Sequence, residues 1–280
     1  MGGINFQSPL FNQIEPGSAI TLMGCVPCGF RFFDPDLAGS ACFYERLAAS
    51  SNFYYSNQRS EFFRTIKFAD QHHLTRVLDV GCGTGLFLDL AKQHGLITAG
   101  AEMNLSAAEV SRSKGHLMFD GPIQAWDRKY HAFFDLICLF QVLEHLPDPV
   151  SFLLELKPFL SAQGIFSVAV PNRLGGLRLT PFEPSNWPPH HVSHWSLPDL
   201  EQLADRAGLL CLKRGADNMP SSHLYLFLSN RILQKKALGQ KCSLNLLFVR
   251  IICFFYRILQ AKFLLPVRGH SIFAFFKKVA

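Results

Sequence analysis

The sequence is poor in charged residues. They make up 17% of the 280 residues, whereas apolar residues make up 49% and 27 residues are phenylalanine. Disordered chains have the opposite composition, with few large apolar residues and many charges, so this class is excluded. The length suits one large domain, or one domain with additions, and is sufficient for a substantial hydrophobic core.

Signals of export, lipid attachment and repetition are also missing. The eight cysteines are scattered, and no basic segment followed by an apolar one comes after Met1. We therefore expect a reducing, cytoplasmic setting rather than a secreted fold held by disulfides. Phe6 stands where N-myristoylation requires Ser or Thr. The sequence has no repeat of a solenoid or propeller period.

Acidic residues are absent from residues 218–280, which hold ten of the 27 basic residues. Such a segment is expected to be attracted to anionic surfaces or substrates. Nucleic acid is an unlikely partner, because the phenylalanines stand within aliphatic runs rather than among spaced Arg and Lys.

The apolar part of this segment, residues 244–265, also lacks the roughly 20 uninterrupted apolar residues that a membrane span needs. Its polar residues, among them Arg250 and Arg257, fall on one narrow stripe at helical spacing. Three interpretations stay open. The helix is buried against the sheet or a second subunit of a homodimer, lies in the interface of an anionic membrane, or forms a lid over an apolar substrate pocket.

From Arg76 onward, apolar segments alternate with helical segments of about 10–15 residues. This alternation is typical of an α/β fold with a parallel sheet covered on both faces. Strands are expected at 76–80, 96–102, 116–119, 133–140, 164–170 and 209–215. The last strand is expected at 269–278, with HLYLFL at 223–228 as the alternative.

Four parts follow along the chain. Residues 1–40 are expected to be irregular, apart from a short strand or two, and residues 41–216 to form the core. A basic, Phe-rich insertion at 217–268, with helices at 222–237 and 243–260, separates the core from its last strand at 269–280. Ligands bind beyond the carboxyl ends of such strands, and the insertion leaves one of these ends, so it is a candidate lid.

The most informative segment is D-V-G-C-G-T-G at residues 79–85. It follows an apolar strand and opens a helix, and Glu102 ends the next strand. Glycines let the backbone approach a ligand, and a carboxylate can accept two hydrogen bonds from ribose hydroxyls. A dinucleotide motif requires glycine where Leu86 stands and does not explain Asp79. S-adenosylmethionine carries an ammonium and a sulfonium instead of phosphate, so the pattern favours it.

These motifs together resemble class I S-adenosylmethionine-dependent methyltransferases, close to the branch that includes quinone-biosynthesis O-methyltransferases. VLDVGCGTG matches the first motif, AGAEMN the second, FFDLICLFQVLEHLPDP the segment around the fourth strand and GIFSVAVPN the fifth strand. The resemblance implies a Rossmann-like, doubly wound sheet of seven strands, mostly parallel with one antiparallel strand. An N-terminal helical cover and a helical insertion near the C-terminus complete this expectation.

The resemblance also implies where the cofactor binds. Asp79 and the glycine loop would surround the methionine moiety, Glu102 would hold the ribose, and Met103 and Ile123 would lie against the adenine. The end of the fourth strand would face the methyl donor. The predicted cofactor-binding residues are Asp79, Gly81, Cys82, Gly83, Gly85, Glu102, Met103, Ile123, Phe140 and Gln141.

Two histidines are candidate catalytic residues. Methyl transfer from a sulfonium requires alignment and a route for the acceptor's proton, which a neutral histidine can take. His145 follows the fourth strand, and His191 lies in PPHHVSHW. Packing or loop-shaping roles stay open for both. In the quinone branch, carboxylates and a histidine here have been linked to a divalent metal. Gln141 stands where that pattern has Glu, so we assign no metal ligand.

Cys25 and Cys28 spell a C-x-x-C knuckle, but residues 1–24 contain no Cys or His that could complete the four ligands of a structural zinc site. The sequence therefore predicts a vestigial knuckle with free thiols. We expect a methyltransferase that acts on a hydroxyl of a small apolar or lipid-linked acceptor. The alternative is a non-catalytic, nucleotide-binding, membrane-associated scaffold of the same fold.

Overall fold

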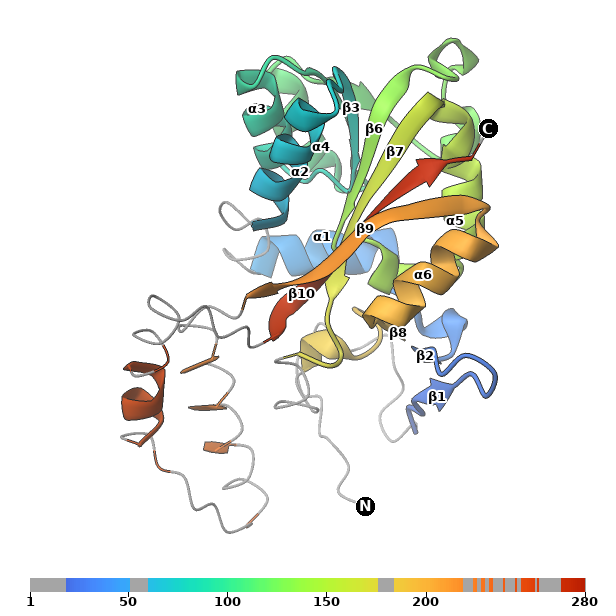
Figure 1. Cartoon of the computed structure of the whole chain (residues 1–280). Helices are drawn as coiled ribbons and strands as arrows, with labels where there is room; N and C mark the ends of the chain where they lie inside the picture. The colour runs from blue at the N-terminus through green and yellow to red at the C-terminus, as the bar shows by residue number, and fades with distance from the viewer. Residues whose placement is uncertain are drawn as a thin grey trace.

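The computed structural model describes residues 19–50, 60–175, 184–218 and 268–279, with short pieces between 224 and 256. Its centre is a seven-stranded sheet ordered β5-β4-β3-β6-β7-β10-β9 (Figure 1). The strands are β3 (Arg76–Val80), β4 (Ile97–Ala101), β5 (Leu117–Phe119), β6 (Phe134–Phe140), β7 (Leu160–Pro171), β9 (Leu209–Asn218) and β10 (Arg268–Lys278). Strands β3 to β7 pair in parallel, and β10 is antiparallel to both of its neighbours. The predicted fold class is confirmed.

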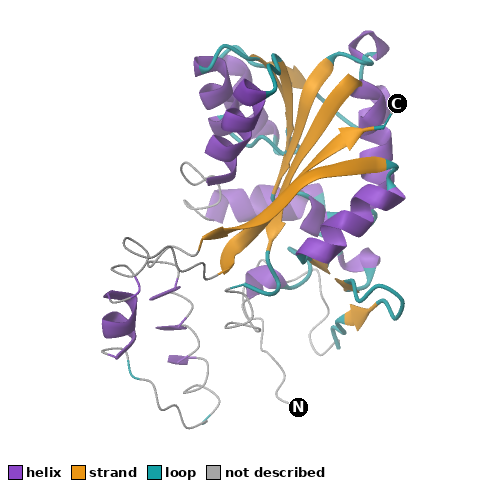
Figure 2. Cartoon of the chain, viewed as in Figure 1, coloured by secondary structure: helices purple, strands orange, loops and turns teal. Residues whose placement is uncertain are grey.

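Helices cover both faces of the sheet (Figure 2). They are α1 (Ala41–Ser50), α2 (Ser60–Gln71), α3 (Leu86–Gln93), α4 (Leu105–Ser113), α5 (Pro149–Leu156) and α6 (Leu197–Arg206). Successive strand residues point to opposite faces. Val77 therefore packs in the cluster with α2 and α3, while Leu78 packs in the cluster with α5 and α6. This alternation explains why the strands are apolar throughout.

The connection from α5 to β7 is short. The α-helix ends at Leu156, residues Lys157–Phe159 form a 3-10 turn, and Leu160 already belongs to β7. Pro158 lacks a backbone N–H and cannot donate the next helical hydrogen bond, so the α-helix stops before it.

The N-terminal segment lies at the carboxyl ends of the parallel strands (Figure 1). Short strands β1 (Met23–Gly24) and β2 (Arg31–Phe32) form a hairpin that pairs with β8 (Ser193–His194) in a second, three-stranded sheet. The backbone N–H of Phe33 also donates to the carbonyl of Val192 at 2.8 Å. The N-terminal segment and the segment that precedes α6 thus meet at the carboxyl ends of the parallel strands.

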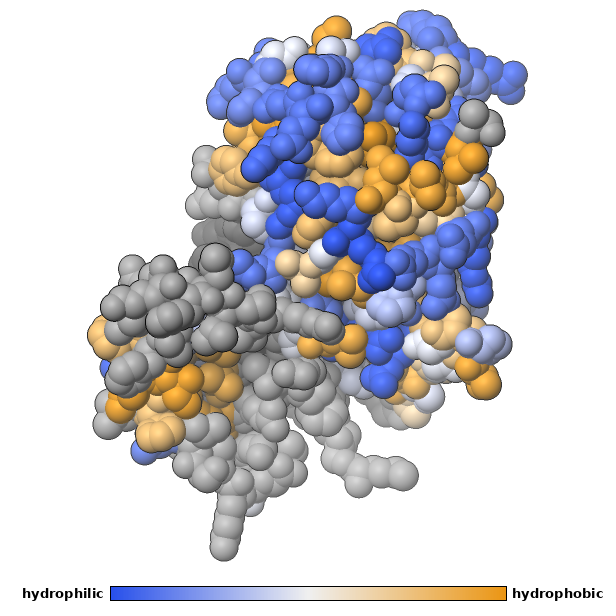
Figure 3. All heavy atoms as spheres, viewed as in Figure 1, coloured by the Kyte–Doolittle hydropathy of each residue, from blue (hydrophilic) through white to orange (hydrophobic). Residues whose placement is uncertain are grey.

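The described pieces between β9 and β10 are mostly helical. Ile232, Val249 and Cys253 are buried together, whereas Phe248 and Phe254 are 56% and 62% exposed. Apolar surface is visible on these pieces (Figure 3). Within the described residues, no helix combines the length and apolar character needed to cross a membrane. The rest of the predicted helices 222–237 and 243–260 lies outside the described residues, and the predicted domain boundaries stay predictions.

Candidate functional site

The glycine loop between β3 and α3 makes a turn that only glycine allows. Gly81 and Gly85 have φ angles of 79° and 80°. A Cβ atom at Gly81 would lie 2.7 Å from Val142 Cγ2, and one at Gly85 would lie 2.7 Å from Ser111 Oγ. Side chains at both positions would therefore be strained and would clash. The loop is anchored to β4, since the backbone N–H of Gly81 donates to the carbonyl of Ala101 at 2.8 Å.

Glu102 closes this loop from the end of β4. Its Oε2 accepts a hydrogen bond from Gly83 N, and its Oε1 accepts one from Asn104 N, both at 2.8 Å. Burial raises the pKa of the Glu102 carboxyl, while these backbone donors and that of Met103 act in the opposite direction. A carboxylate has about four acceptor positions, so two remain for hydroxyl donors of a ligand.

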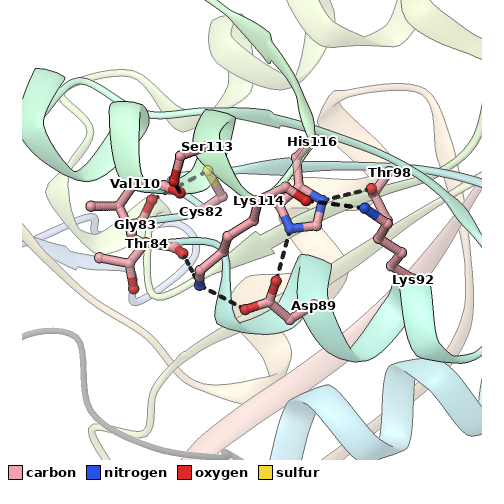
Figure 4. Close-up of polar contacts among 10 residues, drawn as sticks. All are labelled: Cys82, Gly83, Thr84, Asp89, Lys92, Thr98, Val110, Ser113, Lys114 and His116. Carbon is pink, nitrogen blue, oxygen red and sulfur yellow. Dashed lines mark hydrogen bonds and ion pairs between the residues drawn. The ribbon is translucent and has the colours of Figure 1, made fainter.

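A polar network connects the glycine loop to α3 and to the end of α4 (Figure 4). Lys114 Nζ donates to the Thr84 carbonyl and to Asp89 Oδ2, each at 2.7 Å. The ring of His116 lies between Asp89 Oδ1, 3.0 Å from Nε2, and Thr98 Oγ1, 2.8 Å from Nδ1. Burial raises the pKa of Asp89, but hydrogen bonds from Lys114 and His116 outweigh it and leave the pKa below its usual value.

Three histidines meet at the carboxyl end of β6. His145 ends the 3-10 turn η5 (Leu143–His145), and His190 and His191 follow η8 (Pro184–Asn186). The ring centroids lie 4.7 Å apart for His145 and His190, 5.0 Å for His145 and His191, and 4.4 Å for His190 and His191. The structure thus brings the two predicted catalytic histidines together and adds His190, which the sequence did not single out. His194 instead packs on Phe33.

Burial keeps these imidazoles uncharged. It lowers the pKa of His145 to about 3, and a neighbouring His190 acts in the same direction. Burial also lowers the pKa of His190 and, well below its ordinary value, that of His191. His145 Nδ1 lies 2.5 Å from the His190 carbonyl, which also accepts from the Tyr44 hydroxyl at 3.2 Å. Since a carbonyl only accepts, His145 carries its proton on Nδ1 and has a lone pair on Nε2.

A comparison with known proteins decides the family. A family model described as a methyltransferase domain matches residues 49–213, which is more than half of the chain. The chain belongs to this methyltransferase family. The expectation of a class I S-adenosylmethionine-dependent methyltransferase is thereby confirmed.

Individual relatives agree with this assignment. The ubiquinone biosynthesis O-methyltransferase of Histophilus somni is 31% identical over 108 residues, which cover 35% of this chain. The match covers 45% of that relative, so the chain spans less than half of its length. The match to this relative therefore covers about a third of the present chain.

Solved structures show the same fold. A methyltransferase from Thermotoga maritima, described as a possible histamine N-methyltransferase, has a TM-score of 0.54 and 17% identity, covering 84% of this chain and 98% of that one. The plantazolicin methyltransferase BpumL, crystallised with S-adenosylhomocysteine, has a TM-score of 0.52 and 17% identity over 84% of this chain and 90% of its own.

Most of the remaining predicted cofactor residues are buried. Asp79, 3% exposed, stands one residue before the end of β3, and Cys82, Ile123 and Phe140 are also buried. Burial raises the pKa of the Cys82 thiol, so it is neutral and unsuited to act as a nucleophile. The side chain of Met103 is 63% exposed. Their contacts with a cofactor stay predictions.

Gln141 stands out because it has a φ of 59°, which is uncommon for a residue other than glycine. Its backbone N–H donates to Ala169 O at 2.7 Å, and its Nε2 donates to Glu61 Oε1 at 3.4 Å and Ser271 Oγ at 3.3 Å. The side chain therefore links β6 to α2 and β10. Its predicted role toward the methyl donor stays a prediction.

The sequence did not reveal the network of Lys114, Asp89 and His116. No spacing motif marks these residues, because α4, α3 and β5 bring them together only in the folded chain. The thiols of Cys25 and Cys28 lie in the β1–β2 turn, and no third protein ligand joins them among the described residues.

Proposed function

We propose that this chain transfers the methyl group of S-adenosylmethionine to a hydroxyl of a small apolar or lipid-linked acceptor. The observation that carries the proposal is the pairing of Glu102 with the glycine loop, next to a buried Asp79 and one strand away from three neutral histidines. The glycine loop with Glu102 and Asp79 suits a cationic nucleoside. The three histidines suit an acceptor that gives up a proton.

The loop residues suit this cofactor chemically. Gly81 and Gly85 leave no room for a Cβ atom. Because glycine has none, the backbone can lie close to a ligand at the end of β3. Asp79 offers a negative charge where an ammonium and a sulfonium would bind, and the remaining acceptor positions of Glu102 suit two ribose hydroxyls. Bound S-adenosylmethionine supplies an activated methyl carbon, which passes to the acceptor oxygen as its bond to sulfur breaks. Asp79 and Glu102 would hold the cofactor in line for this displacement.

The histidines suit a hydroxyl acceptor. The Nε2 lone pair of neutral His145 can accept a hydrogen bond from the hydroxyl, and its proton is directed to that lone pair as the oxygen–methyl bond forms. Glu144 Oε1 lies 3.9 Å from this Nε2. The Glu144 side chain is 1% exposed, and its carboxylate would stabilise the resulting imidazolium. The ubiquinone-related relatives, named as O-methyltransferases, support an oxygen acceptor.

A lipid-linked acceptor agrees with the chemistry of the insertion. Phe248, Phe254 and Leu233 are exposed on its described helical pieces, and ten basic residues with no acidic one lie in residues 218–280. Exposed apolar side chains beside basic ones favour binding in the interface of an anionic membrane. We propose that this surface brings the site to an acceptor held in a membrane.

Incubation of metabolite and lipid extracts with isotopically labelled cofactor tests the function. We expect one class of hydroxyl compounds to gain the label, and we expect Asp79→Asn and His145→Gln to lose the product. His145→Gln should still bind S-adenosylhomocysteine, whereas Asp79→Asn should bind it weakly. Binding without any labelled product across such extracts would favour the scaffold alternative.

A further inference from the structure

We propose that His145, His190 and His191 bind a divalent transition-metal ion, with zinc as the preferred metal. The existence of the site does not depend on the proposed function; only the role of the ion toward an acceptor does. The three residues come from two loops about 45 residues apart in the chain, and both loops lie at the carboxyl end of β6.

The ring nitrogens are already close enough for a shared ligand. One nitrogen of each histidine lies within 4.8 Å of the others. Nitrogens bound to one zinc ion at about 2.0–2.1 Å are about 3.4 Å apart in tetrahedral geometry. The rings of His190 and His191 are stacked with 18° between their planes, so these rings would rotate to direct their nitrogens toward one ion. Among the described residues, this is the one group of three or more His, Cys, Asp or Glu side chains with that spacing.

The hydrogen bonds of two rings match those of metal-bound histidines. In metal sites, the nitrogen that does not bind the metal usually donates to a carbonyl or carboxylate, which fixes the tautomer and the ring orientation. His145 Nδ1 lies 2.5 Å from the His190 carbonyl, and His190 Nδ1 lies 2.7 Å from the Ser185 carbonyl. Both rings therefore present Nε2 as a lone pair.

The surrounding residues hold these rings in place and favour a cation. Tyr44 packs edge-on against His145 at 5.4 Å, and its hydroxyl donates to the same carbonyl of His190. The Glu144 carboxyl lies 3.9 Å from His145 Nε2 and would lower the cost of placing a positive ion in this buried cluster.

The ligand type decides which metals fit. Imidazole nitrogen suits zinc, copper, iron and nickel, whereas magnesium and calcium prefer several oxygen ligands. Three protein nitrogens would leave a fourth tetrahedral position open, as in catalytic zinc sites. If the proposed function holds, the acceptor oxygen takes that position. The ion would then lower the pKa of the acceptor hydroxyl, whose proton would pass to solvent. The acceptor oxygen would displace the sulfur of the cofactor from the methyl carbon.

The experiment uses the full chain after removal of metals by dialysis against a chelator, with cobalt(II) as a spectroscopic probe and zinc as competitor. Cys25→Ser is introduced so that the C-x-x-C thiols do not bind the probe. We expect one equivalent of cobalt, visible absorption bands of a tetrahedral nitrogen site without thiolate charge-transfer bands, and displacement by zinc but not by magnesium.

The variants His190→Gln and His194→Gln form a matched pair. Both histidines lie between η8 and α6, but His194 belongs to β8, its Nε2 contacts the Asn186 carbonyl, and it lies outside the cluster. His190→Gln should weaken cobalt binding about tenfold or more, and His194→Gln should leave it unchanged. Zinc should also raise the melting temperature of the parent chain. This measurement does not depend on whether a variant folds.

Absence of a stoichiometric cobalt site in the folded, metal-free chain would overturn the proposal, as would equal binding by His190→Gln. Calorimetry on the same preparation measures S-adenosylhomocysteine binding. A chain that binds this nucleoside but not cobalt would refute the metal site without refuting the proposed function. Metal binding without any methylated product would leave the site established and its role toward an acceptor refuted.

Discussion

Glu102 and Gly83 are joined at the ligand end of the sheet, where the Glu102 carboxylate accepts a hydrogen bond from the backbone N–H of Gly83 at 2.8 Å. The residue expected to recognise ribose thus also fixes the loop expected to hold the methionine moiety. A single substitution at Glu102 should therefore disturb both halves of the cofactor site.

We expect Glu102→Gln to reduce affinity for S-adenosylhomocysteine about 10–100-fold. The amide keeps the shape but replaces charged acceptors, and hydrogen bonds to charged groups contribute about 1.5–3 kcal/mol. Titration calorimetry measures the change. Glu109→Gln, an exposed acid on α4, serves as control and should bind like the parent. Equal affinities for all three proteins would refute the assigned role of Glu102.

Cofactor affinity should depend on pH through Glu102. Burial holds its pKa above the ordinary value, and ribose hydroxyls that donate to the carboxylate favour the ionised form. Binding therefore releases a proton, and affinity falls as the pH falls from neutrality through this raised pKa. Calorimetry at several pH values should show the dependence in the parent and in Asp79→Asn, but not in Glu102→Gln. A cofactor affinity that does not change with pH in the parent would contradict this role of Glu102.

Lys114 should act as a positioning residue for the glycine loop. Lys114→Met removes the hydrogen bonds to the Thr84 carbonyl and to Asp89, so we expect the KM for S-adenosylmethionine to rise about fivefold with little change in kcat. The control is Lys129→Met, which loses a surface pair with Asp127 and a cation–π contact with Tyr130, both away from the loop. A lower kcat at unchanged KM would argue against a role in positioning the loop.

Leu136 tests the packing between the sheet and the helices α2 and α3. It is completely buried in β6, and we expect Leu136→Ala to lower the free energy of unfolding by about 2–5 kcal/mol. Leu154→Ala, at a half-exposed position on α5, should change it by about 0.5 kcal/mol. Urea denaturation followed by circular dichroism compares the two. Similar losses would show that burial does not set the stability here.

Membrane attachment should require the exposed phenylalanines of the insertion. We expect the parent to float with vesicles that contain anionic lipid, and to do so less at high salt, because basic residues contribute. Replacing Phe248 and Phe254 by Ser should abolish flotation, while Phe63→Ser, at a 48% exposed site on α2, should not. No flotation of the parent on anionic vesicles would remove the membrane proposal.

Local patterns were sufficient to predict much of the fold. Near-continuous apolar strands, the turn of glycines after β3 and the acid after β4 identified the parallel sheet and the cofactor motif. These features are readable because each depends on residues close in sequence: a positive φ requires glycine at Gly81 and Gly85, and an apolar strand reports burial on both faces. The resemblance to a family added the antiparallel last strand.

The sequence by itself therefore determined the layers, the loop and the carboxylate that faces it. Only the tertiary structure decided which distant side chains share one site. His145 meets His190 and His191 because β6 and the segment before β8 end at the same edge, and Lys114 reaches Thr84 because α4 packs beside the loop. Such contacts depend on how elements pack across the sheet, and no local spacing or periodicity encodes that arrangement.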